Sequence, residues 1–129
     1  MIIDASALVA ILLGEPEAAI FIQAIATAGK RLVAAVSVLE TAIVVETKKG
    51  PAGGRELDLF LHAAQIDVAA MTYEQTELAR WAYRQFGEGR HPARLNLGDC
   101  CSYALSKHSG EPLLYKGKDF TLTDVDSAL

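Results

Sequence analysis

Short apolar runs alternate along the chain with longer stretches in which apolar residues recur every three or four positions. The first of these runs predicts a strand at 1–3 that is buried on both faces, and the others predict further strands at 30–35, 65–70 and 112–115. The longer stretches predict helices at 5–12, 17–28, 38–49, 57–64, 73–86 and 97–105. This alternation predicts an α/β fold in which helices cover both faces of one parallel sheet.

The chain has 129 residues and no internal repeat, so we expect a single domain over residues 1–129, with a basic, flexible link at 48–55. No apolar run is long enough to span a membrane. The opening Met-Ile-Ile-Asp has no basic segment ahead of an apolar core, which argues against a signal peptide. Cys100 and Cys101 are adjacent and cannot easily bridge, so we interpret both as reduced thiols of a cytoplasmic protein.

Hydrophobic residues make up 51% of the chain, mostly Ala, Leu, Ile and Val in helical patterns. A dense core is one explanation for this surplus. The other is self-association, and we predict a homodimer formed through apolar helix faces.

The stretch 95–105 is typical of a loop that leads into a helix, and it carries Asp99 at the start of an apolar face. Asn96 or Gly98 is a candidate cap. We expect the apolar face to be buried; its members are Leu97, Cys100, Cys101, Ala104 and Leu105. Burying a carboxylate there is costly unless a cation or hydrogen-bond donors compensate it. The alternative is that Asp99 only caps the helix and stays half solvated.

Three further acids follow predicted strands or open the helices beside them. Asp4 comes at the carboxyl end of the first strand, where open α/β sheets place ligand sites, and Ser6 can add a hydroxyl. Glu40 stands one turn into the helix after the second strand, and Asp119 follows the fourth. The alternatives are that Asp4 is only an N-cap and that Glu40 completes a capping box with Ser37.

If the sheet is parallel, these four carboxylates gather at one edge and raise one another's pKa. A hard divalent cation offsets the repulsion between the carboxylates. Oxygen ligands without His or Cys favour Mg²⁺, with Mn²⁺ as a substitute. Such an ion lowers the pKa of a bound water and stabilises a departing oxyanion. The pattern therefore favours metal-dependent phosphodiester hydrolysis.

The net charge of −4 argues weakly against nonspecific nucleic-acid binding, but basic residues lie close to the acids in sequence. We interpret them as a basic rim for a phosphate backbone around an acidic pocket. Ordinary solvated charge is the alternative, above all for Arg80 and Arg84. The candidate RNA-binding residues are Arg90, His91, Arg94, Lys116 and Lys118.

Four motifs occur in order: Met-Ile-Ile-Asp-Ala-Ser at 1–6, Ser-Val-Leu-Glu at 37–40, His-Pro-Ala-Arg-Leu-Asn-Leu-Gly-Asp at 91–99 and Leu-Leu-Tyr-Lys-Gly-Lys-Asp-Phe at 113–120. With them, the chain resembles the PIN-domain ribonucleases of the VapC toxin type from end to end. The resemblance implies a PIN-like three-layer sandwich, with a central parallel sheet flanked by helices. It also implies Mg²⁺-dependent endoribonuclease activity on RNA and inhibition by a cognate VapB-type antitoxin.

The resemblance also implies roles for individual residues. Asp4 and Asp99 are the expected direct metal ligands, whereas Glu40 and Asp119 act through metal-bound water or position a second cation. Ser6 and Asp124 are supporting residues. Many family members carry an acid two positions before the Asp-Phe pair, where this chain has Gly117, so Asp124 is an alternative fourth acid.

Other functions fit the same residues. One is a DNA-acting nuclease or a phosphatase-like hydrolase. Another is a binding module with little turnover that holds RNA or a partner helix in an acidic groove. That groove would also accept an antitoxin arginine placed among the carboxylates.

Overall fold

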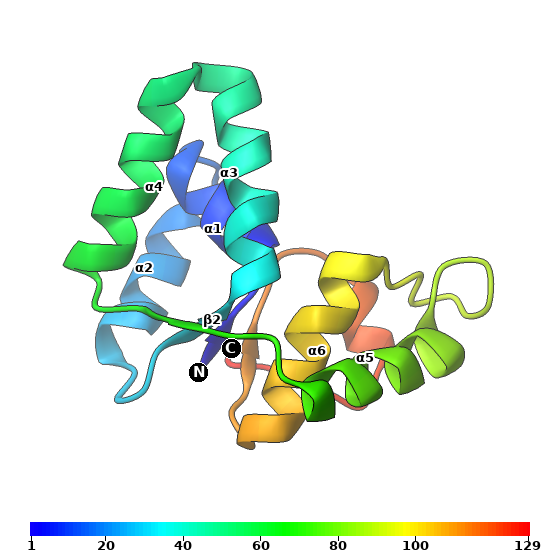
Figure 1. Cartoon of the computed structure of the whole chain (residues 1–129). Helices are drawn as coiled ribbons and strands as arrows, with labels where there is room; N and C mark the ends of the chain where they lie inside the picture. Colours follow the sequence, from blue (N-terminus) through cyan, green and yellow to red (C-terminus); the bar gives the residue numbers. More distant parts are fainter.

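A four-stranded parallel sheet forms the centre of the computed structural model, which describes all 129 residues (Figure 1). The strands lie in the order β3-β2-β1-β4, so β1 is central and pairs with β2 on one side and β4 on the other. The strands are short: β1 Ile2–Ile3, β2 Leu32–Ala34, β3 Asp67–Ala69 and β4 Leu113–Leu114. The predicted strand positions and parallel sheet are confirmed.

Six α-helices and one 3₁₀ turn surround the sheet. They are α1 Ala5–Leu12, α2 Ala18–Thr27, α3 Ala35–Lys49, α4 Pro51–Ala63, α5 Tyr73–Phe86, α6 Leu97–Ser109 and η1 Asp119–Leu122. Figure 1 shows α1 to α4 gathered on one side of the strands and α5 and α6 on the other. The predicted three-layer architecture, a central parallel sheet flanked by helices, is therefore confirmed. No helix is both long and apolar enough to cross a lipid bilayer.

Two hydrophobic cores lie on opposite faces of the sheet, because successive strand side chains point to opposite faces. Ile3 and Leu114 enter the core beneath α1, α2 and α4. Their neighbours Ile2 and Leu113 enter the core beneath α5 and α6. All four side chains are essentially inaccessible to solvent, so the end of β1 is held firmly from both faces.

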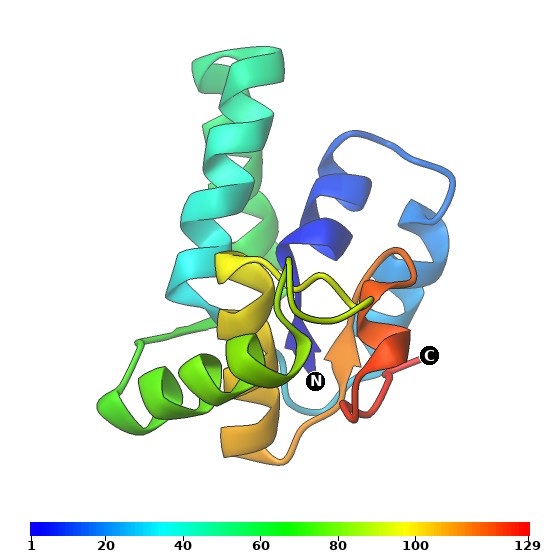
Figure 2. The ribbon, with the colours of Figure 1, turned by 90° about the vertical axis from the view of Figure 1, so that its right-hand side faces the viewer.

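The predicted flexible link at 48–55 is wrong, because α4 begins at Pro51 directly after α3 ends. Gly50 makes this sharp reversal with a φ of 67°, a conformation that favours glycine. Gly53 then lets the two helices approach closely, since a Cβ there would come within 2.5 Å of the Val45 carbonyl oxygen. Figure 2 shows α3 and α4 as a long antiparallel pair that projects beyond the sheet.

Candidate active site

Asp4 follows β1 directly and is only 2% exposed, yet its carboxylate is fully supplied with donors. Oδ2 accepts hydrogen bonds from the backbone N–H of Ser6 at 3.0 Å and from its hydroxyl at 2.6 Å. Oδ1 accepts one from the Ser102 hydroxyl at 2.6 Å. Asp4 caps α1, as the alternative interpretation expected, and it is also buried at the carboxyl end of the central strand. Three donors on one carboxylate fix its orientation.

Ser102 and Ser37 form a buried hydroxyl chain behind Asp4 that the sequence analysis missed. Both are 0% exposed, and their oxygens lie 3.0 Å apart. A hydroxyl has one proton, so when Ser102 donates to Asp4, Ser37 must donate to Ser102. The predicted Ser37 cap is wrong, because α3 starts at Ala35 and Ser37 faces the interior. One feature of the sequence could have indicated this chain: Ser102 is a polar residue on the otherwise apolar face of α6, among Cys101, Tyr103 and Ala104.

Ser6 links Asp4 to the segment after β4. Its hydroxyl donates to Asp4 and accepts a hydrogen bond from the backbone N–H of Lys116 at 3.0 Å. The Lys116 ammonium lies 2.8 Å from a Glu15 carboxylate oxygen and 3.4 Å from one of Glu17, so its charge is already compensated. Lys116 therefore braces the site rather than offering a free cation to RNA.

Asp99 lies in the first turn of α6 and belongs to a complete capping box. The Asn96 side chain accepts the Asp99 N–H at 2.9 Å, and Asp99 Oδ2 accepts the Asn96 N–H at 3.1 Å. Burial raises the pKa of Asp99 to about 7, against the lowering effect of the Asn96 bond. Repulsion from Asp4, Glu40 and Asp119 also contributes to this rise. The residue thus caps the helix and also faces three other acids.

Glu40 projects from α3 toward the start of α6. Its carboxylate lies against Gly98, where an added Cβ would come within 2.6 Å of Oε1. Burial, followed by repulsion from Asp4, raises the pKa of Glu40. Because α3 has no side-chain cap, the capping-box alternative for Glu40 is wrong, and the side chain is available to the acidic cluster.

The two candidates for the fourth acid lie in different places. Asp119 is exposed at the start of η1, and its charge acts on Asp99. Asp124 instead accepts a hydrogen bond from the Tyr103 hydroxyl at 2.6 Å and lies 3.3 Å from the Lys107 ammonium. These two partners hold the pKa of Asp124 below its ordinary value despite partial burial, and Asp124 is not among the acids that perturb Asp99.

The remaining candidate RNA-binding residues lie on the loops that flank α6 and η1. The Arg90 guanidinium lies 5.4 Å from the centre of the Tyr83 ring, and the Arg94 guanidinium lies 3.9 Å from a Glu88 oxygen. His91 Nδ1 accepts the Ala93 N–H at 3.1 Å. Lys118 is exposed and has no carboxylate within 4.0 Å, so its charge is free.

Asp4, Glu40, Asp99 and Asp119 thus form one electrostatic cluster from four separated segments. Every donor that they offer is an oxygen, which suits a hard divalent cation. In this structure, however, no three acidic, His or Cys side chains converge tightly enough to hold an ion together. The Asp99 bond to Asn96 contributes to this spread, because it draws one carboxylate oxygen toward the helix cap.

An apolar patch adjoins the cluster. Leu39, Ile43 and Leu97 are 62%, 58% and 79% exposed and line a cavity of about 320 Å³ that also contains Glu40 and Gly98. The prediction that Leu97 is buried is therefore wrong. It is the first residue of α6 and is exposed, whereas the other members of the predicted face are buried: Cys100, Cys101, Ala104 and Leu105.

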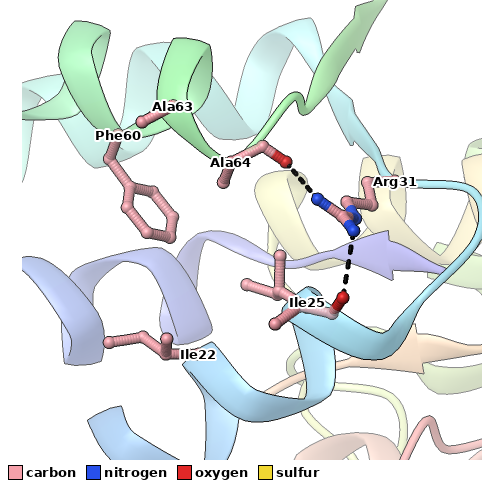
Figure 3. Close-up of a pocket in the computed structure, with 7 residues that line it drawn as sticks. Ile22, Ile25, Arg31, Phe60, Ala63 and Ala64 are labelled. Atoms are coloured by element: carbon pink, nitrogen blue, oxygen red, sulfur yellow. Dashed lines mark hydrogen bonds between the residues drawn. The ribbon is translucent and has the colours of Figure 1, made fainter.

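A second apolar cavity, of about 350 Å³, lies between α2 and α4 (Figure 3). Its only charged residue is Arg31, whose guanidinium donates to the backbone oxygens of Ala64, at 2.7 Å, and Ala26, at 3.1 Å. Because this guanidinium is engaged and the other lining residues are apolar, the cavity offers no acid–base chemistry. The acidic cluster is the better candidate for catalysis.

Comparisons with known proteins agree with this geometry. The PIN domain family model matches residues 1–126. A protein named Ribonuclease VapC, from Mycolicibacterium smegmatis, is 55% identical over 97% of this chain and 97% of its own length. Ribonuclease VapC30 of Mycobacterium tuberculosis is 54% identical over 97% of this chain and 95% of its own. The crystal structure of Mycobacterium tuberculosis VapC20, described as a sarcin-ricin loop cleaving toxin, superposes with a TM-score of 0.77. That match covers 96% of this chain and 95% of the other at 16% identity, which indicates a shared fold.

Proposed function

The chain belongs to the PIN-domain family, and on that premise we propose that it is the toxin of a type II toxin–antitoxin pair and acts as an endoribonuclease. Relatives at 55% and 54% identity over nearly their whole length carry the name Ribonuclease VapC. The observation in this chain that supports hydrolysis of phosphodiester bonds most strongly is the acidic cluster. Burial and three neighbouring acids raise the pKa of Asp99 to about 7.

We propose Mg²⁺ as the cofactor, with Mn²⁺ as a substitute, held by Asp4 and Asp99 and assisted by Glu40 and Asp119. The all-oxygen donor set and the mutual repulsion of these carboxylates support the assignment. When bound, such an ion activates water and stabilises the departing oxyanion. The Asn96 N–H engages only Oδ2 of Asp99, so the other carboxylate oxygen would be available to hold the ion.

The protein's own contribution is orientation and charge. Ser6 and Ser102 hold both oxygens of the Asp4 carboxylate in place, so this ligand needs little reorganisation when the site is loaded. Gly98 leaves room for Glu40 beside them. Lys118, Arg90 and Arg94 lie on the surrounding loops and supply positive charge for the RNA backbone.

The partners that we propose are RNA, a cognate VapB-type antitoxin and a second copy of the chain. The acidic cluster suits an antitoxin arginine, whose guanidinium would pair with the carboxylates and exclude the metal.

The patch formed by Leu39, Ile43 and Leu97 supports a homodimer, because three large apolar side chains in one exposed patch favour burial against a partner. A Leu97→Asp variant is expected to be monomeric in light scattering, whereas a wild-type monomer at micromolar concentration would contradict the proposal.

Substitution of Asp99 tests the enzyme. Asp99→Asn removes the carboxylate but keeps a side chain that can cap α6, so we expect a folded protein without metal-dependent RNA cleavage. Asp58→Asn, an exposed acid on α4, is the matched control and should cleave normally. Full activity of the Asp99→Asn variant would refute the proposal.

Comparison of substrates separates the other functions. Cleavage of RNA but not of DNA or small phosphate esters is expected, and preferred cleavage of DNA or of small esters would favour the corresponding alternative. Calorimetric titration with Mg²⁺ or Mn²⁺ tests the alternative that the protein is a binding module rather than an enzyme. An absence of divalent binding at millimolar concentrations would favour a protein that holds RNA or a partner with little turnover.

A further inference from the structure

Trp81, the only tryptophan of the chain, forms an aromatic surface on α5 away from the acidic cluster. Its ring is stacked on that of Tyr103, with ring centres 6.2 Å apart and planes at 26°, and the centre of the Phe86 ring lies 6.0 Å away in an edge-to-face arrangement. Despite these contacts the side chain is 40% exposed. Part of the indole is therefore available to a ligand, while the rest is held in place.

The residues beneath Trp81 make this surface rigid. Tyr103 is 1% exposed, and its hydroxyl is bound to Asp124. Lys107 donates to the Asp124 backbone oxygen at 2.7 Å, and its ammonium lies 5.6 Å from the centre of the Tyr103 ring. An aromatic ring that is already immobilised loses little entropy when a second ring stacks on it.

The surface borders a shallow cavity of about 450 Å³ that also contacts Arg84 and Lys107. Two acids line it, but both are paired: Glu77 with Arg80 at 2.9 Å, and Asp124 with Lys107. Arg84 is exposed and has no carboxylate within 4.0 Å. The cavity thus combines an open aromatic face with one uncompensated guanidinium.

We propose that this cavity binds an unpaired nucleotide of the RNA, with its base stacked on Trp81 and its phosphate contacted by Arg84. Bases stack on aromatic side chains regardless of sequence, and a guanidinium pairs well with phosphate. This proposal rests on the proposed ribonuclease function and deepens it. A purely apolar protein partner fits less well, because four charged side chains line the cavity, and one of them, Arg84, is unpaired.

The position of the cavity agrees with this assignment. Tyr103 and Lys107 follow Asp99 by one and two turns on the same side of α6, which places Lys107 about 12 Å from Asp99 along the helix axis. That distance corresponds to about four nucleotides of stacked strand. A strand whose scissile phosphate lies at the acidic cluster therefore reaches the Lys107 end of the cavity only if it extends several nucleotides to one side.

The single tryptophan provides a direct measurement. Single-stranded RNA is titrated into the Asp99→Asn protein, which keeps the RNA uncut, and quenching of Trp81 fluorescence is followed. We expect saturable quenching by a strand several nucleotides long and little by a dinucleotide. In the active protein, kcat/KM is compared between the longer strand and a dinucleotide. Trp81→Ala is expected to lower the preference for the longer strand about tenfold, mainly by raising its KM. Trp81→Phe should recover most of the loss.

Charge is tested separately. Arg84→Gln should weaken binding of the longer strand and reduce the salt slope of log K by about one. Arg55→Gln, which removes an exposed arginine from α4 in the opposite layer, is the matched control. An equal effect of both substitutions would mean that only the net charge of the protein matters. That result would overturn the proposed nucleotide site.

The outcomes separate the two proposals. Wild-type protein that cleaves RNA while Trp81 remains silent overturns the nucleotide site alone. A Trp81 signal that follows protein concentration without RNA assigns the surface to self-association and also overturns it. If wild-type protein cleaves no RNA of any length, the ribonuclease function fails, and the nucleotide site fails with it.

Discussion

The Glu40 carboxylate packs against Gly98 so closely that a side chain at residue 98 would have to displace it. A methyl group on Gly98 would lie within 2.6 Å of Glu40 Oε1 and 2.8 Å of Oε2. We therefore expect Gly98→Ala to displace Glu40 and to reduce RNA cleavage at least tenfold, measured as kcat/KM. The atoms displaced belong to the far end of a flexible side chain, so we expect little change of stability in urea unfolding.

Gly29→Ala is the matched control for that experiment. Gly29 has an ordinary backbone conformation, and no atom lies within 4 Å of the position that an added methyl group would take, so activity and stability should change little. A Gly98→Ala protein with wild-type activity would show that Glu40 is not needed where the structure places it.

Ser102→Ala is expected to disturb Asp4 without touching the substrate. The substitution removes a donor from Asp4 Oδ1 and leaves the buried Ser37 hydroxyl without its acceptor, at a cost of about 1–3 kcal/mol. We also expect weaker Mg²⁺ or Mn²⁺ binding by calorimetry, because the carboxylate loses part of its fixed orientation. Ser106→Ala is the control: Ser106 is also buried on α6 but donates to the Glu111 backbone oxygen. Equal metal affinities in the two variants would mean that the hydroxyl chain only stabilises the fold.

The fourth acid is resolved by comparing Asp119→Asn with Asp124→Asn. Loss of the Asp119 charge should lower the pKa of Asp99, as followed by carboxyl NMR, and should reduce cleavage. Asp124→Asn removes the charge paired with Lys107, but its amide oxygen can still accept from Tyr103 and Lys107 still donates to its backbone oxygen, so stability should fall by no more than about 1 kcal/mol and metal binding should stay intact. The reverse pattern would assign the role to Asp124.

The raised pKa of Asp99 predicts a specific dependence of stability on pH. The folded protein has a pKa of about 7 for this group, against an ordinary value of 3.8, so folding favours its protonated form. This contribution to stability is fully present below pH 3.8 and is lost as the pH rises through 7. In metal-free buffer, Asp99→Asn should therefore exceed wild type in unfolding free energy by about 1–2 kcal/mol at pH 8, after allowance for solvent screening, and by little at pH 4. Asp58→Asn should show no such trend.

Much of the fold follows from local patterns in the sequence. The apolar runs place all four strands, and the periodic stretch 73–86 matches α5 from end to end, with its Thr72 cap bonded to the Gln75 N–H. The errors arose where tertiary packing overrides local preference. Glycines that usually mark a flexible link lie inside α4, because Gly53 and Gly54 contact α3. Ser37 has the typical residue type of a cap, but its hydroxyl finds a partner in Ser102, 65 positions away.

For the site, the sequence indicates the four acids because each follows a strand or opens a helix beside one. It cannot show which oxygens of Asp4 receive a donor, since the donors come from Ser6 and Ser102 at opposite ends of the chain. Nor does it separate Asp119 from Asp124, five positions apart. That distinction depends on which side of α6 each carboxylate reaches.

The Ser6 hydroxyl oxygen connects two segments that are 110 residues apart in sequence. It gives its proton to Asp4 and receives the amide proton of Lys116, three residues before Asp119. A shift of the loop after β4 is therefore transmitted mechanically to the central carboxylate through one atom. A molecule that binds at residues 116–119 and moves the Lys116 backbone would therefore act on the same hydroxyl that orients Asp4, which links the rim of the site to its centre.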